Sequence, residues 1–237
     1  ARIFANQGPA EMLVINADDP EAYALREQPV SQVYLFSRRQ EVARGAFLRT
    51  RFLVLRDGER EAVLLHQQEI CIPGAHNLEN ALAASLLAWL GGIEAEIIAD
   101  VLRRFPGVPH RLESLGSVSG VHFVNDSKGT NIDAALKALT ALPEKKVLIA
   151  GGYDKGADFT LFAAAVKEHV SHVVVIGQVA KRLTAAFDQA GFAAYTFAAT
   201  LEEAVSIAYR QAQPGEAVLL SPACASWDMF SSFEERG

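Results

Sequence analysis

Apolar residues form short runs along the whole chain, and the spacing of these runs changes near its middle. In the first part, strand-like runs at Glu11–Asn16, Val33–Phe36 and Ala46–Leu55 precede a turn at Asp57-Gly58 into Ala62–Leu65. The run Ala46–Leu55 partly alternates, which predicts one half-exposed antiparallel strand. An Asp-Gly pair between two apolar runs is typical of a β-hairpin. The first part is therefore expected to contain a sheet that ends in antiparallel strands.

Two helices are predicted next. His76–Leu90 is rich in Ala and Leu and stops at Gly91-Gly92, and Glu94–Phe105 is amphipathic. The loop Pro106-Gly107-Val108-Pro109 follows, and two prolines so close together fit neither a helix nor a central strand. A chain of 237 residues commonly contains more than one core. We therefore expect two domains, residues 1–108 and 109–237.

The second part alternates strands and helices. Continuous apolar runs predict strands at Val121–Val124, Val147–Ala150, His172–Ile176, Ala194–Phe197 and Ala217–Leu220. Helical patterns begin near Asn131, Phe159, Gln178, Leu201 and Ser226. Runs without polar alternation indicate strands covered on both faces, and intervening helices indicate βαβ units. The fold class predicted is therefore α/β, with a mostly parallel sheet in the second domain.

Composition excludes several classes of protein. The net charge of −6 argues against nucleic-acid and membrane-surface binding, and no apolar run is long enough to cross a membrane. The only cysteines, Cys71 and Cys224, lie far apart, which favours a reduced cytoplasmic protein. The six histidines show no zinc-binding spacing, so no metal site is expected within the chain. Because it starts at Ala1, we interpret it as a piece of something longer.

The stretch from Pro109 to Asn131 carries the clearest functional signal. Asp126 follows a buried strand, at the carboxyl end where parallel sheets bind ligands, and the next helix offers free N–H groups to an anion. There Asp126 can bind a ribose hydroxyl, and Lys128 can neutralise a phosphate or acyl-phosphate oxygen. The alternative is that Asp126 caps the turn and Lys128 is solvated. We favour the functional interpretation of this pair.

Three other places are open to two interpretations. Asn77 and Asn80 share a helix face and can hydrogen-bond adenine, unless Asn77 only caps the helix. Arg111 can clamp a phosphate or pair with Glu113 at the surface. The glycine-rich turn around Lys155 can hold a carboxylate, although it is not a Walker A loop and such turns are common for steric reasons.

The segment Ser221–Ser226 places small and hydroxyl residues after the last strand, where they can bind a carboxylate. Cys224 lies within it without a charged neighbour, so we interpret this residue as packed and unreactive.

Six segments together resemble the Mur ligases, in family order across nearly the whole chain. They are NADDP (16–20), GAHNLENALAA (74–84), PGVPHRLE (106–113), VNDSKGTN (124–131), GGYDKGADF (151–159) and LLSPACASWDMFSSFEERG (219–237). Within the family they are most similar to the member that adds D-glutamate to UDP-N-acetylmuramoyl-L-alanine. The resemblance implies the C-terminal part of a central ATP-binding domain, followed by a Rossmann-like C-terminal domain that binds the amino acid and is truncated at its end.

This resemblance also implies an activity and its cofactors. Such ligases use ATP and Mg²⁺ to phosphorylate a carboxylate, and an amine then attacks the acyl phosphate during peptidoglycan precursor synthesis, which supports cell-wall biogenesis, cell shape and cell division. The residues implied in nucleotide binding are Asn77, Asn80, Arg111, Asp126 and Lys128, of which Asp126 and Lys128 are the catalytic candidates. The residues implied around D-glutamate are Thr130, Lys155, Ser226, Trp227 and Phe233.

The expected protein is a cytoplasmic monomer that binds no nucleic acid and does not insert into membranes. Three alternatives remain open. They are another Mur-type ligase, a folylpolyglutamate synthetase-like ligase and a non-catalytic Rossmann-like binding module.

We predict that residues 1–237 alone show no ATPase or ligase turnover. The family's GTNGK[ST] phosphate loop, its magnesium ligands and its carbamylated lysine are absent from this sequence and are expected before Ala1. Nothing here can then hold the β- and γ-phosphates with magnesium. Phosphate release by the purified chain, with the full-length protein as positive control, tests this expectation. Turnover by the chain alone would contradict it.

Overall fold

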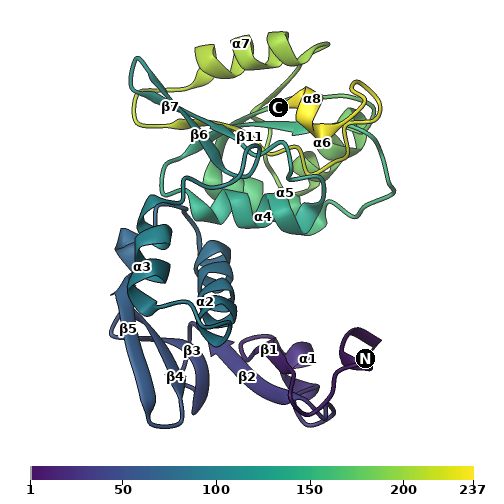
Figure 1. Cartoon of the computed structure of the whole chain (residues 1–237). Coiled ribbons are helices and arrows are strands. Elements are labelled where there is room, and N and C mark those ends of the chain that lie inside the picture. Colours follow the sequence, from purple (N-terminus) through teal and green to yellow (C-terminus); the bar gives the residue numbers. More distant parts are fainter. Residues whose placement is uncertain (1) are drawn as a thin grey trace. The chain divides into compact units, whose positions relative to one another are not determined.

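A computed structural model describes residues 2–237 and divides the chain into two compact units (Figure 1). The first unit extends to Pro106 and the second begins at Gly107. Each unit has its own sheet and its own apolar core. The two are described separately below.

The first unit contains a five-stranded sheet whose spatial order follows the sequence. Its strands are β1 (Met12–Asn16), β2 (Gln32–Ser37), β3 (Arg44–Arg49), β4 (Phe52–Asp57) and β5 (Arg60–His66). The pairs β1–β2 and β2–β3 are parallel, whereas β3–β4 and β4–β5 are antiparallel. Three short helical segments complete this part, the 3₁₀ turns Arg2–Phe4 and Gln67–Glu69 and the helix α1 (Pro20–Ala24). The predicted Asp57-Gly58 hairpin is confirmed as the β4–β5 turn.

The prediction of one strand over Ala46–Leu55 is wrong, because this run folds back on itself as β3 and β4. Arg49 pairs with Phe52, so only Thr50 and Arg51 form the turn. Both have left-handed backbone angles, with φ of 49° and 70°. Two-residue hairpins require such angles and usually place Asn-Gly there, so a Thr-Arg pair gives no turn signal in the sequence.

Two helices, α2 (Ala75–Leu90) and α3 (Ala95–Arg104), pack against this sheet as predicted (Figure 1). The buried face of α2 includes Leu82, Leu86 and Trp89, which pack in one cluster with Leu53 and Leu55 of β4. Removing such side chains from water is the main favourable contribution to this unit's stability.

The second unit contains a six-stranded sheet with the order β10-β9-β8-β11-β7-β6. Its strands are β6 (Glu113–Val118), β7 (Val121–Asn125), β8 (Lys146–Gly151), β9 (Val170–Ile176), β10 (Tyr195–Phe197) and β11 (Ala217–Leu220). All neighbouring strands are parallel except β6 and β7, so the mostly parallel α/β fold is confirmed. The sequence did not predict β6, because five of its six side chains are exposed and it lacks an apolar run.

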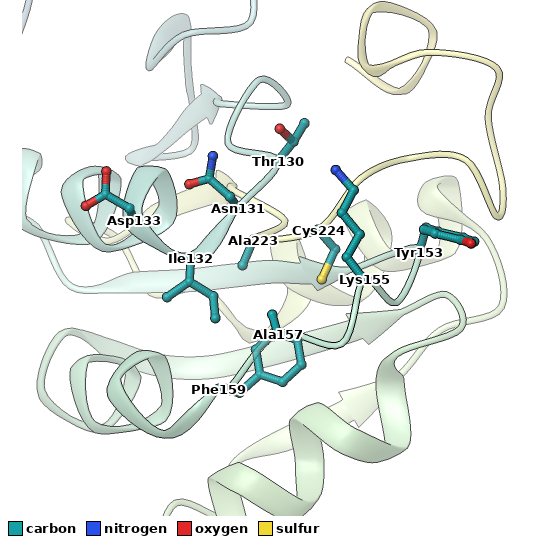
Figure 2. Close-up of a pocket in the computed structure, with 10 residues that line it drawn as sticks. All are labelled: Thr130, Asn131, Ile132, Asp133, Tyr153, Lys155, Ala157, Phe159, Ala223 and Cys224. Atoms are coloured by element: carbon teal, nitrogen blue, oxygen red, sulfur yellow. The ribbon is translucent and has the colours of Figure 1, made fainter. Parts of the chain in front are cut away.

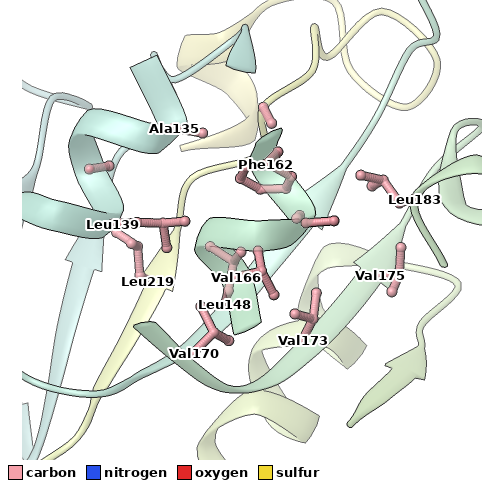
Figure 3. Close-up of a cluster of buried hydrophobic side chains, with 14 of the residues drawn as sticks. Ala135, Leu139, Leu148, Phe162, Val166, Val170, Val173, Val175, Leu183 and Leu219 are labelled. Carbon is pink, nitrogen blue, oxygen red and sulfur yellow. The ribbon is translucent and has the colours of Figure 1, made fainter. Parts of the chain in front are cut away.

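Side chains of the central strands alternate between two cores. Leu148 of β8 and Leu219 of β11 face a large cluster covered by α4 (Ile132–Ala141), α5 (Thr160–His169) and α6 (Ala180–Gln189) (Figure 3). Ile149 and Val218 point to the opposite face, where α7 (Leu201–Gln211) covers them. This two-sided burial is why these strands read as continuous apolar runs.

The helix predicted near Ser226 is wrong. After β11 the chain makes a single turn, in which Met229 and Phe230 donate to the Ser226 carbonyl, and the only later helix is α8 (Phe233–Arg236). Residues from other parts of the chain hold this segment, because the Tyr153 N–H donates to the Ala225 carbonyl and the Gln178 N–H donates to the Asp228 carboxylate. These contacts compete with a regular helix.

We predict that replacing Thr50-Arg51 by Asn-Gly raises the free energy of unfolding by about 1 kcal/mol, because both new residues tolerate left-handed angles. Thermal unfolding of the chain measures the effect as a higher Tm. Arg51→Ala is the control, since it removes the side chain without relieving the backbone. An unchanged or lower Tm for the Asn-Gly variant would contradict the assignment of strain to this turn.

Candidate active site

Three turns of the second unit, each following a strand, meet at one edge of the sheet. They follow the neighbouring parallel strands β7, β11 and β8, whose carboxyl ends lie side by side. Most of the residues that the sequence proposed for the second unit lie in these turns. This is the edge where open α/β sheets bind ligands.

Asp126 is a buried carboxyl at the end of β7, with only 7% of its surface exposed. It accepts hydrogen bonds from the Ser221 hydroxyl at 2.7 Å and the Leu112 N–H at 3.2 Å. Burial raises its pKa to about 6, while these hydrogen bonds and the charge of Arg111 act in the opposite direction. Gly129 packs so closely that a Cβ there would lie 2.5 Å from the Asp126 carboxylate. The carboxyl is therefore held in one position.

Lys128 is half-buried and packs on an aromatic ring. Its ammonium nitrogen lies 3.6 Å from the centroid of the Phe233 ring, within the range of a cation–π interaction. The Lys128 side chain therefore has a preferred position against this ring. This contact also joins two residues that the resemblance assigns to different ligands, one to phosphate and the other to D-glutamate.

Arg111 is exposed and forms no ion pair with any of residues 2–237. The proposed partner, Glu113, instead accepts hydrogen bonds from the His110 N–H and the Asn125 amide. The interpretation of Arg111 as a surface ion pair with Glu113 is therefore wrong. Its guanidinium is available to a ligand.

A pocket of about 450 Å³ opens between the turns after β7, β8 and β11 (Figure 2). It is lined by Thr130, Asn131, Ile132, Asp133, Tyr153, Lys155, Ala157, Phe159, Ala223 and Cys224. Thr130 and Lys155, proposed from the sequence for the same ligand, thus share one cavity. Phe159, Ala157 and Ile132 give it an apolar floor (Figure 2).

The other proposed amino-acid residues lie outside the pocket lining. Ser226 is 2% exposed, whereas Trp227 is 63% exposed. The Lys155 ammonium lies 4.6 Å from the centroid of the Trp227 ring, which connects Trp227 to the pocket through a lining residue. Phe233 is linked to the site through Lys128 instead.

Cys224 lines the pocket but is not poised as a nucleophile. Burial raises the pKa of its thiol to about 12, so it stays neutral at physiological pH. The expectation of a packed, unreactive cysteine agrees with this environment.

The glycines after β8 serve close packing. A Cβ on Gly151 would lie 2.0 Å from the Ile176 carbonyl oxygen, and one on Gly152 would lie 2.3 Å from that of Ala225. Farther along the turn, Arg182 pairs with Asp154 and donates to the Ala157 carbonyl. These contacts hold the turn that carries Lys155, so the steric interpretation of its first two glycines is the correct one.

In the first unit, Asn77 and Asn80 share a helix face as predicted, with the Asn80 amide donating to the Asn77 side-chain oxygen at 3.3 Å. The alternative of N-capping by Asn77 is wrong, because Gly74 occupies the N-cap position of α2. The Asn77 amide donates instead to the Pro73 carbonyl at 2.7 Å. The exposed Asn80 keeps donor and acceptor capacity for a ligand.

Two residues at the sheet edge make contacts that the sequence did not indicate. Ser221 donates to Asp126 from 95 positions away, a contact that only strand order could predict. Arg236 is buried at 2% exposure, although its polar neighbours Glu234 and Glu235 suggest a solvated tail. For Arg236, the available signal was its place in the segment that resembles the Mur ligases.

Two features are absent from residues 2–237. No group of three or more His, Cys, Asp or Glu side chains is placed to hold a metal ion. Helices with the length and apolar character of a membrane span are also absent from this part of the chain.

We predict that the Asp126 carboxyl titrates near pH 6 in the folded protein. Because this pKa lies above the ordinary 3.8, its contribution to stability is present below pH 3.8 and is lost as pH rises through 6. Carboxyl ¹³C NMR with Asp126→Asn for assignment measures the midpoint. Asp158, whose pKa is lowered by hydrogen bonds from Thr160, is the internal control. An Asp126 midpoint at or below 4 would contradict the burial argument.

Two known protein domains match the sequence of this chain. The sequence profile of the Mur ligase middle domain matches residues 1–88, and that of the Mur ligase glutamate ligase domain matches residues 110–224. A UDP-N-acetylmuramoylalanine–D-glutamate ligase from Pelotomaculum thermopropionicum is 52% identical over 238 residues, covering 100% of this chain and 52% of that protein. The ligase of the same name from Thermoanaerobacter sp. (strain X514) is 48% identical over 241 residues, with the same coverage of both chains.

Solved structures show the same fold at low sequence identity. Folylpolyglutamate synthase from Mycobacterium tuberculosis, complexed with ADP, has a TM-score of 0.67 at 16% identity, covering 92% of this chain and 54% of that one. UDP-N-acetylmuramate-alanine ligase from Thermotoga maritima has a TM-score of 0.64 at 19% identity, covering 90% and 48%. The chain spans about half the length of the curated relatives it matches. With two adjacent Mur ligase domains, each matched by its own profile, this chain belongs to the Mur ligase family.

Proposed function

We propose that the protein to which this chain belongs is an ATP-dependent ligase that adds D-glutamate to UDP-N-acetylmuramoyl-L-alanine. The observation that carries the proposal is the pocket containing both Thr130 and Lys155, at the sheet edge that also holds Asp126 and Lys128. The relatives at 48–52% identity are named for this reaction, and we assign the protein to peptidoglycan precursor synthesis on that support.

The pocket suits a small anionic amino acid. Lys155 supplies a cation and Thr130 a hydroxyl at its polar side, and the apolar floor excludes water from the aliphatic part of a ligand. Charge-assisted hydrogen bonds to a carboxylate are the strongest contacts that such a site can make. We assign Lys155 and the nearby buried Ser226 to the carboxylates of D-glutamate, with Phe233 and Trp227 at its margin.

The chemistry of the residues also fits a nucleoside triphosphate. The Asn77–Asn80 pair presents amide donors and acceptors suited to adenine, and Arg111 has no ion pair among residues 2–237 to compete with phosphate. Asp126 is ionised for the most part at neutral pH and can accept a ribose hydroxyl. In this proposal Lys128 provides positive charge to the phosphates.

The proposed reaction forms an acyl phosphate on the carboxyl group of UDP-N-acetylmuramoyl-L-alanine. The amine of D-glutamate attacks its carbonyl carbon, and phosphate leaves. Bound magnesium supplies charge neutralisation at the phosphates in such ligases, and its ligands are not assigned to this chain. The contribution of this chain is to orient the amine and to stabilise negative charge through Lys128. We place the protein in the cytoplasm as a monomer.

We predict that Lys155→Ala in the full-length protein raises the KM for D-glutamate about 10- to 100-fold, the loss expected for one charge-assisted hydrogen bond worth about 1.5–3 kcal/mol. The KM for ATP changes little, because Lys155 faces the amino-acid pocket. Steady-state kinetics with varied D-glutamate measure the effect. Lys181→Ala is the matched control, since it removes an exposed lysine of α6 outside the pocket.

The substrate assignment fails if Lys155→Ala leaves the KM for D-glutamate unchanged. A panel of amino acids separates the rival ligases: L-glutamate with a folate acceptor indicates a folylpolyglutamate synthetase-like enzyme, and a different amino acid on a muramoyl acceptor indicates another Mur-type ligase. No product with any acceptor, with nucleotide binding retained, indicates a non-catalytic module.

A further inference from the structure

Arg236 places a buried positive charge behind the candidate site. Only 2% of this residue is exposed, and its guanidinium forms no ion pair with any of residues 2–237, although the negative charge of Asp228 acts on it from a greater distance. Burial lowers its pKa to about 10, so it remains protonated at neutral pH. A buried cation without a counter-ion costs free energy unless hydrogen bonds replace its hydration.

Those hydrogen bonds go to two of the three turns that form the site. Arg236 donates from Nε to the Ser127 hydroxyl at 3.0 Å and from Nη2 to the Ser127 carbonyl at 2.7 Å. It donates from Nη1 to the Cys224 carbonyl at 3.1 Å. Ser127 directly precedes Lys128, and Cys224 lies two residues before Ser226. One guanidinium therefore joins the turn after β7 to the turn after β11.

Further bonds tie the C-terminal helix α8 to the same place. The Ser127 hydroxyl donates to the Phe233 carbonyl at 2.8 Å, and the Asn125 amide donates to the Gly237 carbonyl at 3.1 Å. The Phe233 ring then lies under the Lys128 ammonium. Helix α8 thus carries both Arg236, which joins the two turns, and the Phe233 ring that Lys128 contacts.

We infer that Arg236 is a positioning residue that couples the proposed phosphate-binding turn to the proposed amino-acid-binding turn. This inference rests on the proposed function for the identity of the two ligands. A planar guanidinium spreads its donors over three nitrogens in fixed directions, whereas the donors of a lysine ammonium all leave one nitrogen on a flexible stem. Arg236 acts through Lys128, Ser226 and Phe233 and touches neither ligand itself.

The test uses the full-length protein and hydrogen exchange measured by mass spectrometry. Arg236→Met preserves much of the apolar volume, and Arg236→Lys preserves the charge. In case these two variants fail to fold, Ser127→Ala removes only the two bonds of the Ser127 hydroxyl, one from Arg236 and one to the Phe233 carbonyl. All three are expected to speed amide exchange about tenfold or more in peptides covering residues 122–131 and 220–230, with Ser127→Ala the mildest. Exchange in β9 is expected to stay at the wild-type rate. Arg210→Met, an exposed arginine of α7, is the control.

Steady-state kinetics distinguish a positioning role from a purely structural one, because a purely structural role would not change both KM values in a folded variant. In Arg236→Lys the KM for ATP and the KM for D-glutamate are expected to rise together, at least fivefold each, with melting temperature within a few degrees of wild type. Rescue by Lys to wild-type kinetics would overturn the inference, because charge alone would then suffice. Unchanged exchange in both turns, or faster exchange throughout the sheet, would also overturn it. If the wild-type protein does not ligate D-glutamate, the proposed function fails, and the exchange pattern still decides the role of Arg236.

Discussion

The pairing of β11 between β7 and β8 is the constraint on which the candidate site depends. Leu220 lies opposite Asn125 on one side and Ile149 on the other, so the last strand of the sheet joins two strands that precede it by 70 to 95 residues. At the edge the backbone continues this connection, because the Asp126 N–H donates to the Leu220 carbonyl and the Gly151 N–H donates to the Pro222 carbonyl. A shift of β11 by one residue would move Ser221 away from Asp126 and reverse the two faces of the strand.

Electrostatics at this edge are local and oppose the charge of the whole molecule. The chain carries a net charge of −6, yet four cations gather near this edge. Lys128 and Lys155 lie in the turns after β7 and β8, and Arg236 lies in the helix packed on them. Arg111 lies in the loop before β6, next to Leu112, whose N–H donates to Asp126. Three of them are stabilised differently: Arg236 by neutral acceptors, Lys128 by an aromatic ring and the exposed Lys155 by solvent and the Trp227 ring. Asp126 is the one buried acid among them, and its raised pKa reflects the cost of burial. This arrangement suits anionic ligands without requiring a positively charged protein.

The elements predicted correctly from the sequence are those whose burial produces a recognisable pattern of apolar residues. Strands such as β8 and β9 are covered on both faces and therefore form apolar runs, and α2 ends at a Gly pair that stops a helix. The exposed edge strand β6 and the Thr50-Arg51 turn lack such signals and were not predicted. The helix expected near Ser226 failed because tertiary hydrogen bonds to Ala225 and Asp228 outweigh local preference.

The candidate site followed from the sequence in part. Asp126, Lys128 and Lys155 could be proposed because each follows a strand that the apolar pattern predicted. Strand order was not readable, so the contacts of Asp126 with Ser221 and of Arg236 with Ser127 emerged only from the structure. Helix capping by Asn77 and an ion pair between Arg111 and Glu113 were excluded by hydrogen bonds to Pro73 and from His110, which residue spacing does not predict.

The most direct measurement of the central claim is an amide NMR titration of the full-length protein with D-glutamate. The protein is first saturated with UDP-N-acetylmuramoyl-L-alanine and a non-hydrolysable ATP analogue. The account predicts saturable shifts at Thr130, Lys155 and Ser226, and much weaker shifts when L-glutamate replaces D-glutamate. Absence of shifts at these three residues, or equal responses to both enantiomers, would contradict it.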